Sequence, residues 1–230
     1  VSHMGYIKRT ALAEFKAQGR GGVGSKGSNT RDADFIEHLY PAKMHDTMMF
    51  FTQSGRCFWQ KVYGIPEGNK ASKGRAIQNL LNIEKDDKVK AFITVRGLND
   101  AEYINSHYIM MGTRNGVIKR CLLENFSRPR TNGIIAITIK DGDELLQAIL
   151  TDGTNEVMMA TRSGRAIRFH ETKIRVIGRT GAGVRGITLD DDTDSVAGFI
   201  GIKPDMESDI LVISENGSGN RSNVDEHRLT

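Results

Sequence analysis

Short runs of apolar residues, each followed by a polar residue and a Ser-Gly or Asn-Gly pair, recur along the chain. The run at 48–55 reads MMFFTQSG, and similar runs occupy 109–116, 157–164 and 210–217, while a fifth copy begins mid-strand at Gly5. Such a pair is typical of a tight hairpin, because glycine and asparagine tolerate positive φ. The pattern therefore predicts hairpins with turn glycines at 5, 55, 116, 164 and 217, at spacings of 50, 61, 48 and 53 residues.

Two further elements repeat with the same period. Segments 87–93, 143–149 and 194–200 each have an acidic start and an apolar strand pattern, and glycine-led segments lie at 74–77, 133–136 and 186–189. The stretch 35–40 fits a strand better than a helical turn, and the runs are too short for long helices. Each unit thus contains about four short strands. Units of this length predict an all-β, propeller-like ring of four-stranded blades that occupies 1–230 as one domain.

Composition fits this fold and excludes several protein classes. The chain has 25 glycines and only 4 prolines, which suits many tight turns. No apolar run approaches the ~18 residues that span a bilayer, so no membrane partner is expected. Cys57 and Cys121 are too few for a disulfide framework or a zinc site, and we interpret them as small buried hydrophobes in a reducing, cytoplasmic compartment.

The net charge of +4 is unevenly distributed. Residues 1–76 carry 12 Lys/Arg against 6 Asp/Glu, whereas 77–155 balance at 10 against 10 and 156–230 have 10 against 12. A basic N-terminal third indicates contact with a polyanion that starts there.

One repeat position concentrates positive charge. The fourth residue after each turn glycine is, in order, Arg9, Trp59, Arg120, Arg168 and Arg221. Because a strand alternates its faces, we predict that this position emerges on the same part of every blade and forms a basic track for phosphates. The further cations near it are Lys8, Arg56, Lys61, Lys119 and Arg165. The alternatives are a solvated edge for the arginines and, for Trp59, stacking on sugar or packing under a neighbouring blade.

The loops between strands supply a second predicted set. The long glycine-rich loop 18–34 opens with QGRGGVG, in which glycines let backbone N–H groups approach an anion. Its spacing does not match a nucleotide P-loop. The candidate DNA-binding residues of the loops are Gln18, Arg20, Gly21, Gly22, Gly24, Lys26, Lys73, Arg75, Arg128, Arg130, Arg179 and Arg185.

No catalytic or metal-binding pattern is found. The six histidines are scattered without metal-ligand spacing, and the acidic run 190–194 precedes a strand as a solvated turn would. We expect no catalytic residue, no metal and no cofactor in this chain. A protein-interaction propeller is the alternative function, with Phe58, Trp59 and Tyr63 as its candidate patch.

The segment GYIKR at 5–9, the loop 18–24 and the repeated Ser/Asn-Gly turns resemble the C-terminal domain of the bacterial DNA gyrase A subunit, over essentially the whole chain. The resemblance implies a β-pinwheel, in which neighbouring blades exchange a strand and duplex DNA wraps around a basic perimeter. The wrap would present DNA to the cleavage core for ATP-driven negative supercoiling. It further implies two partners in an A2B2 assembly, the rest of the gyrase A subunit together with the gyrase B subunit. ATP and Mg would act in other domains, and the location would be bacterial and nucleoid-associated.

Two departures from the family pattern stand out. The family motif is Gln-Arg/Lys-Arg-Gly-Gly-Arg/Lys-Gly, and here Gly19 and Val23 replace two of its cations, which we expect Lys26 to offset in part. Five turn motifs are present where the family usually has six blades, so we expect a ring of five to six blades, which is incomplete if it follows the family. The topoisomerase IV C-terminal domain is the nearest alternative family, and the motif at 18–24 favours gyrase.

Overall fold

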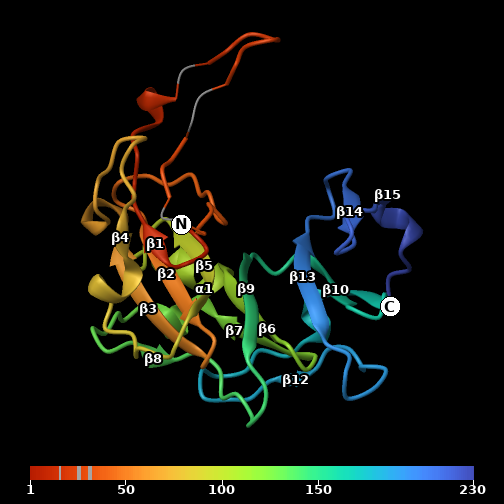
Figure 1. The fold of residues 1–230 in the computed structure, drawn as a ribbon. Helices are drawn as coiled ribbons and strands as arrows, with labels where there is room; N and C mark the ends of the chain where they lie inside the picture. Colours follow the sequence, from red (N-terminus) through yellow and green to blue (C-terminus); the bar gives the residue numbers. More distant parts are fainter. Residues whose placement is uncertain (16, 25–26, 31–32) are drawn as a thin grey trace.

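The computed structural model describes residues 1–15, 17–24, 27–30 and 33–230. Its antiparallel strands form five sheets that follow one another in chain order around an arc, from the sheet that contains β1 to the β14–β15 hairpin (Figure 1). We call these sheets blades 1 to 5. The predicted all-β fold is confirmed.

Two blades have four strands. Blade 2 has the order β5-β2-β3-β8, and blade 3 has the order β12-β7-β6-β9. Their bounds are β2 Thr47–Thr52, β3 Arg56–Lys61, β5 Val89–Val95, β8 Ile134–Ile135, β6 Tyr108–Thr113, β7 Val117–Leu122, β9 Leu145–Thr151 and β12 Val184–Arg185. In each, the short fourth strand comes from the following repeat unit, so neighbouring blades exchange a strand as a β-pinwheel requires.

The other sheets contain fewer strands. Blade 1 pairs β1 (Tyr6–Ile7) with β4 (Arg75–Ala76), which is again donated by the next unit. Blade 4 contains β10 (Glu156–Thr161), β11 (Ala166–His170) and β13 (Val196–Ile202), and blade 5 contains β14 (Asp209–Ile213) and β15 (Gly219–Asn223). The described residues thus form five blades, of which blades 2 and 3 have four strands each.

Helical segments are short and lie between strands. The one α-helix of the described residues is α1 (Ala101–Ser106), and a 3-10 turn follows the second strand of each hairpin. These turns are η1 Leu12–Glu14, η2 Val62–Gly64, η4 Leu123–Phe126, η5 Glu171–Lys173 and η6 Val224–Glu226, with a further one, η3 Ile77–Asn79, after β4. None of the described helices is long and apolar enough to cross a membrane.

Two predicted strands differ from the structure. In the stretch 35–40, Ile36 forms only an isolated bridge with Ser2. The element expected at 186–189 begins earlier, as β12 at Val184–Arg185. The reason is that Gly183, with φ 91°, takes the left-handed position that Gly74 and Gly133 hold before β4 and β8.

The core lies between the blades and follows from the period of two along each strand. On β2, Met48 and Phe50 pack toward blade 1 with Ile7, whereas Met49 and Phe51 pack toward blade 3. The same alternation recurs on β6 and β10. Blade 5 is followed by no further described blade, and its Leu211 and Ile213 are exposed.

The hairpin turns share a hydrogen bond to a Ser or Thr hydroxyl, and in blades 1 to 4 an Asp carboxylate also accepts from the turn. All five predicted turn glycines have φ between 81° and 91°. In blade 2 the Thr52 hydroxyl accepts from the Arg56 N–H (3.3 Å), and Asp87 accepts from the Ser54 N–H (3.1 Å). In the other blades, the hydroxyl that accepts in place of Thr52 belongs to Ser2, Thr113, Thr161 or Ser214. The carboxylate that accepts in place of Asp87 belongs to Asp34, Asp143 or Asp194. The acidic strand starts therefore cap turns.

Candidate nucleic-acid interface

The repeated arginine position lies between blades rather than on an exposed track. Arg120, on β7, is 6% exposed, and its Nε lies 3.1 Å from Oε2 of Glu171, which is fully buried in η5 of the next blade. Glu171 also accepts from the Thr151 hydroxyl (2.7 Å) and the Asn155 N–H (2.9 Å). The guanidinium stacks on Tyr108, with 3.7 Å from Cζ to the ring centroid.

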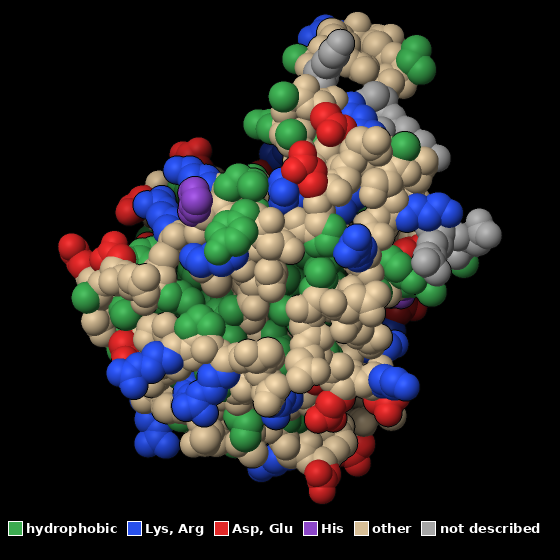
Figure 2. Space-filling view, turned by 90° about the vertical axis from the view of Figure 1, so that its left-hand side faces the viewer, with side chains coloured by type: hydrophobic (Ala, Val, Ile, Leu, Met, Phe, Trp, Pro, Cys, Tyr) green, Lys and Arg blue, Asp and Glu red, His purple; other side chains and the backbone are tan. Residues whose placement is uncertain are grey.

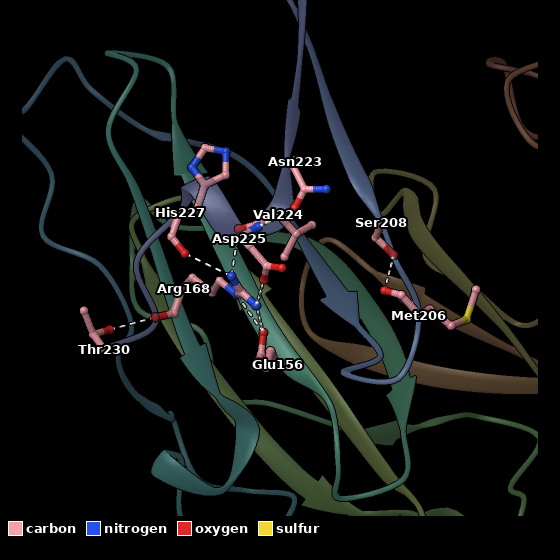
Figure 3. Close-up of polar contacts among 9 residues, drawn as sticks. All are labelled: Glu156, Arg168, Met206, Ser208, Asn223, Val224, Asp225, His227 and Thr230. Carbon is pink, nitrogen blue, oxygen red and sulfur yellow. Dashed lines mark hydrogen bonds and ion pairs between the residues drawn. The ribbon is translucent and has the colours of Figure 1, made fainter.

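Arg168 also joins blade 4 to blade 5, but through backbone carbonyls of blade 5, because its carboxylate partner Glu156 lies on β10 of its own blade (Figure 3). Its Nε donates to Glu156 at 2.6 Å, and its Nη1 donates to the carbonyls of Val224 (2.7 Å) and His227 (3.0 Å) at η6. The side chains of Arg168 and Glu156 are about nine-tenths buried. These contacts give both buried charges a partner. A buried charge without a partner would destabilise the fold.

Of the remaining copies, Arg9 has this role, whereas Trp59 and Arg221 do not. Arg9 donates to the Ile65 carbonyl (2.9 Å) after η2 and pairs with Glu67 (2.8 Å). Trp59 is half-buried and packs against the core between blades 2 and 3. Arg221 lies in the last blade, where no described blade follows it, and its side chain is 75% exposed beside Asp209.

The lysines that precede two of these arginines are loop anchors. Lys119 is fully buried, and its Nζ donates to the carbonyls of Ala136 (2.7 Å), Gly181 (3.0 Å) and Arg179. Lys8 donates in the same manner to the carbonyls of Asn69 (2.9 Å) and Ser72 (2.8 Å).

The expectation of one exposed cationic track is therefore wrong for the buried members of this set. They are Arg9, Arg120, Arg168, Lys8 and Lys119, of which Lys8 and Arg9 are half-buried and Arg168 has a side chain that is 10% exposed. Alternation places a repeated residue on one face of each blade, but the next blade covers that face. The signal that sequence reasoning missed is the acidic partner, because Glu156 and Glu171 lie on other elements.

Three further predicted cations contact partners from other segments of the chain at the surface. Arg56 donates to the Asn132 carbonyl (2.5 Å), Lys61 donates to the His45 carbonyl (3.1 Å), and Arg165 pairs with Asp190. Binding a phosphate would compete with these contacts, which weakens each of them as a candidate.

The cations best placed for an anion lie on the segments that carry the exchanged strands. We call 66–75, 127–135 and 174–185 the exchange segments. Their predicted cations are Lys73, Arg75, Arg128, Arg130, Arg179 and Arg185, all exposed except the half-buried Arg179. None of these six has an ion-pair partner among the residues that the structure describes.

Two exchange segments meet at one hollow. Arg128 and Arg130, before β8, and Arg179, before β12, line a cavity of about 240 Å³ that also borders Glu124. Three guanidiniums around one carboxylate leave a net positive site. Figure 2, which shows the left-hand side of Figure 1, displays Lys and Arg side chains at several separate points of the surface.

The glycine-rich loop 18–24 is exposed and stands away from the blades (Figure 1). Its shape is set from within, because Gln18 Oε1 accepts from the Gly24 N–H at 2.9 Å and Gly22 donates to the Gly19 carbonyl at 3.2 Å. Gly21 and Gly24 have φ 83° and 78°. Arg20 is exposed, and Lys26 lies outside the described residues.

The described acidic and histidine side chains do not form a metal-binding cluster of three or more. In the acidic run, the hydroxyl and N–H of Thr193 lower the pKa of the Asp191 carboxyl, and Asp194 caps the turn of Ser163. These contacts account for the run as turn structure.

A ring of hairpin blades whose short outer strands are exchanged between neighbours defines a β-pinwheel. The family model for the DNA gyrase C-terminal domain, described as a beta-propeller, matches residues 1–43, 46–96, 107–152 and 155–203. The chain belongs to the DNA gyrase C-terminal domain family.

Similar proteins agree with this assignment. The DNA gyrase A subunit of Salmonella typhimurium is 41% identical over 227 residues, which cover 99% of this chain and 25% of that protein. The DNA gyrase A subunit of Staphylococcus epidermidis is 40% identical over 230 residues, covering 100% and 25%. The chain thus spans about a quarter of the length of these relatives.

Solved structures share the fold. The C-terminal domain of DNA topoisomerase IV superposes with a TM-score of 0.79 at 25% identity, covering 100% of this chain and 68% of that one. The DNA gyrase A C-terminal domain superposes with a TM-score of 0.76 at 24% identity, covering 99% and 71%.

Proposed function

We propose that this chain binds duplex DNA without sequence specificity through its exchange segments and the loop 18–24. The observation that carries the proposal is the set of six exchange-segment cations, which lack ion-pair partners among the described residues. Arg20 in the loop 18–24 is likewise exposed, whereas the other predicted cations on the described strands and hairpin turns are buried or contact a carbonyl or carboxylate. Exposed cations on loops suit phosphate contacts, which provide affinity and little sequence information.

The arrangement of the blades favours a curved path for the DNA. Each exchange segment belongs to a different pair of neighbouring blades, and the blades follow an arc (Figure 1). A duplex that touches successive segments must bend, and several phosphate contacts together offset the cost of bending. We propose that the chain wraps DNA with a defined hand in this way.

The relatives extend the proposal to a whole enzyme. As the C-terminal part of a gyrase A subunit, the chain would present the wrapped DNA to the cleavage core for ATP-dependent negative supercoiling. ATP and Mg would act in other domains of the A2B2 assembly, so this part would be non-catalytic and need no cofactor. Its location would be the bacterial cytoplasm, at the nucleoid. The 40–41% identity to gyrase A subunits favours gyrase over topoisomerase IV.

The test compares two variants that each remove four exposed cations. The first variant replaces four exchange-segment cations by Ala: Lys73, Arg75, Arg128 and Arg130. The second replaces by Ala four exposed lysines outside the exchange segments: Lys85, Lys88, Lys140 and Lys203. Binding to a fluorescent duplex is measured between 50 and 200 mM salt, and linking number is measured after ligation of relaxed circles on the protein. Each lost phosphate contact should lower the salt slope by about 0.9.

We expect the exchange-segment variant to lose affinity, salt slope and the change in linking number, and the control to keep most of all three. Equal losses in both variants would reject the exchange segments as the binding surface. No binding by the unmodified chain at low salt would reject the function itself.

A further inference from the structure

We propose that Lys119 is a positioning residue that presents Arg179 to a phosphate of bound DNA without contacting the DNA itself. The inference rests on the proposed DNA binding and assigns a role to a lysine that the exposed-track hypothesis placed on the surface. It is carried by the hydrogen bonds that join Lys119, on β7, to the backbone of the exchange segment 174–185.

The geometry leaves Lys119 no route to a ligand. Its side chain is fully buried, and its three N–H donors are matched by three carbonyls, those of Ala136, Arg179 and Gly181. One of these belongs to Arg179 itself, so the ammonium fixes the backbone from which that side chain projects. Arg179 is half-buried, lines the hollow with Arg128 and Arg130, and has no ion-pair partner among the described residues.

A second copy of the same anchor shows that the arrangement is a repeated device. Lys8, which holds in blade 1 the position of Lys119 in blade 3, donates to the carbonyls of Asn69 and Ser72 in the exchange segment 66–75. In both segments the turn closes through the same backbone bond, from Ser72 N–H to the Asn69 carbonyl (3.0 Å) and from Gly181 N–H to the Gly178 carbonyl (3.0 Å). Both anchored segments bear cations.

Blade 2 provides the contrast inside the same chain. Phe58 stands at the equivalent position, packs in the core and cannot anchor carbonyls. There the segment is held instead by Arg56, which donates to the Asn132 carbonyl from the strand surface. The lysine is therefore not needed for strand exchange as such, since β8 pairs with β3 without it.

The charge of the anchor is sensitive to pH. Burial lowers the pKa of Lys119 to about 8, with a further lowering by Arg179 opposed by Cys121. The thiols that face this region, Cys57 and Cys121, have pKa values raised by burial. Above pH 8 the neutral amine keeps two donors for three carbonyls and loses its charge-assisted bonds, so the anchor weakens.

The test measures duplex affinity and salt slope from pH 7 to pH 9.5 for the unmodified chain, Lys119→Met, Arg179→Ala and the control Lys85→Met, an exposed lysine outside the exchange segments. The probe is a fluorescent duplex of fixed length at constant ionic strength. Circular dichroism at each pH monitors folding. The pH profile distinguishes a positioning role of Lys119 from a purely structural one. If Lys119 only stabilised the fold, the pH dependence of DNA affinity would not require Arg179.

We expect the unmodified chain and Lys85→Met to lose about three- to tenfold in affinity across pH 8, with the salt slope falling by about 0.9. Arg179→Ala and Lys119→Met should bind with the weaker affinity already at pH 7 and show a flat profile. If Lys119→Met does not fold, the comparison of the unmodified chain with Arg179→Ala decides. An identical pH dependence with and without Arg179 would overturn the proposal, whereas absence of any binding would instead reject the proposed function.

Discussion

The Nε atom of Arg120 lies 3.1 Å from Oε2 of Glu171, and this ion pair joins β7 of blade 3 to η5 of blade 4. The equivalent Arg168 joins blade 4 to η6 of blade 5, and Arg9 joins blade 1 to the turn after η2. A repeated arginine therefore holds consecutive blades together, beside the exchanged strands. The consequence is that charge at this position serves the fold.

Replacing Arg120 by Ala should destabilise the fold strongly. The change leaves the Glu171 carboxylate buried without its counter-charge, which costs about 3–5 kcal/mol. The matched control is Arg221→Ala at the same repeat position, where the side chain is exposed and the expected cost is within about 1 kcal/mol. The free energy of unfolding from urea titration at pH 7 checks both. Similar losses for the two variants would contradict the role of the Arg120–Glu171 ion pair in holding blades 3 and 4 together.

The turn glycines offer a second matched pair. Gly55 and Gly217 have φ 85° and 81°, so alanine at either position costs about 1–2 kcal/mol of backbone strain. A Cβ at Gly55 would also lie 2.4 Å from the Ile137 carbonyl oxygen, whereas nothing lies within 4 Å at Gly217. Gly55→Ala should therefore be clearly the more destabilising in thermal unfolding. A larger loss at Gly217 would show that the close approach of Ile137 does not constrain the turn of Gly55.

Sequence alone predicted the hairpins, because the turn glycines and their spacing are local signals. Strand exchange came from the resemblance, since β8 pairs Ile135 with Arg56 and Ile134 with Cys57 of β3, residues far apart in the sequence whose pairing no local period records. The sequence predicted the repeated arginine position but wrongly placed Arg120 on an exposed surface. Whether Arg120 faces water depends on Glu171 in the next unit, and a period of two cannot tell a covered face from an open one.

Most of the predicted cations on loops are exposed, whereas several of those on strands are covered. Loop cations such as Arg128 and Arg130 are exposed, as is usual for connections that run over the surface. Strand cations next to a blade interface are covered. Once the order of the blades is known, the position of a cation relative to the blade interface therefore tells whether its side chain is exposed or covered.

The stability of the fold should depend on pH through Lys119 with a sign opposite to that of DNA affinity. Its pKa is about 8 in the folded chain and near 10.5 when unfolded, so between these values the unfolded state binds more protons. The free energy of unfolding therefore rises with pH from 8 to 10.5, by up to about 3 kcal/mol from this residue. Urea titrations of the unmodified chain and Lys119→Met at pH 7 and 10.5 measure the difference. A stability difference between the two proteins that is constant with pH would show that Lys119 titrates normally.

Restoring the two cations that the family motif has at positions 19 and 23 should strengthen DNA binding. Val23 is fully exposed, and a Cβ at Gly19 would meet nothing within 4 Å, so Gly19→Arg and Val23→Lys fit without strain. Gln18 and Gly22 keep the loop shape through their own hydrogen bonds. Each added phosphate contact should steepen the salt slope by about 0.9. The double variant is compared with Gly19→Gln/Val23→Gln in duplex binding and in ligation of relaxed circles. If both double variants bind equally, the loop does not contact phosphate, and the exchange segments alone hold the DNA.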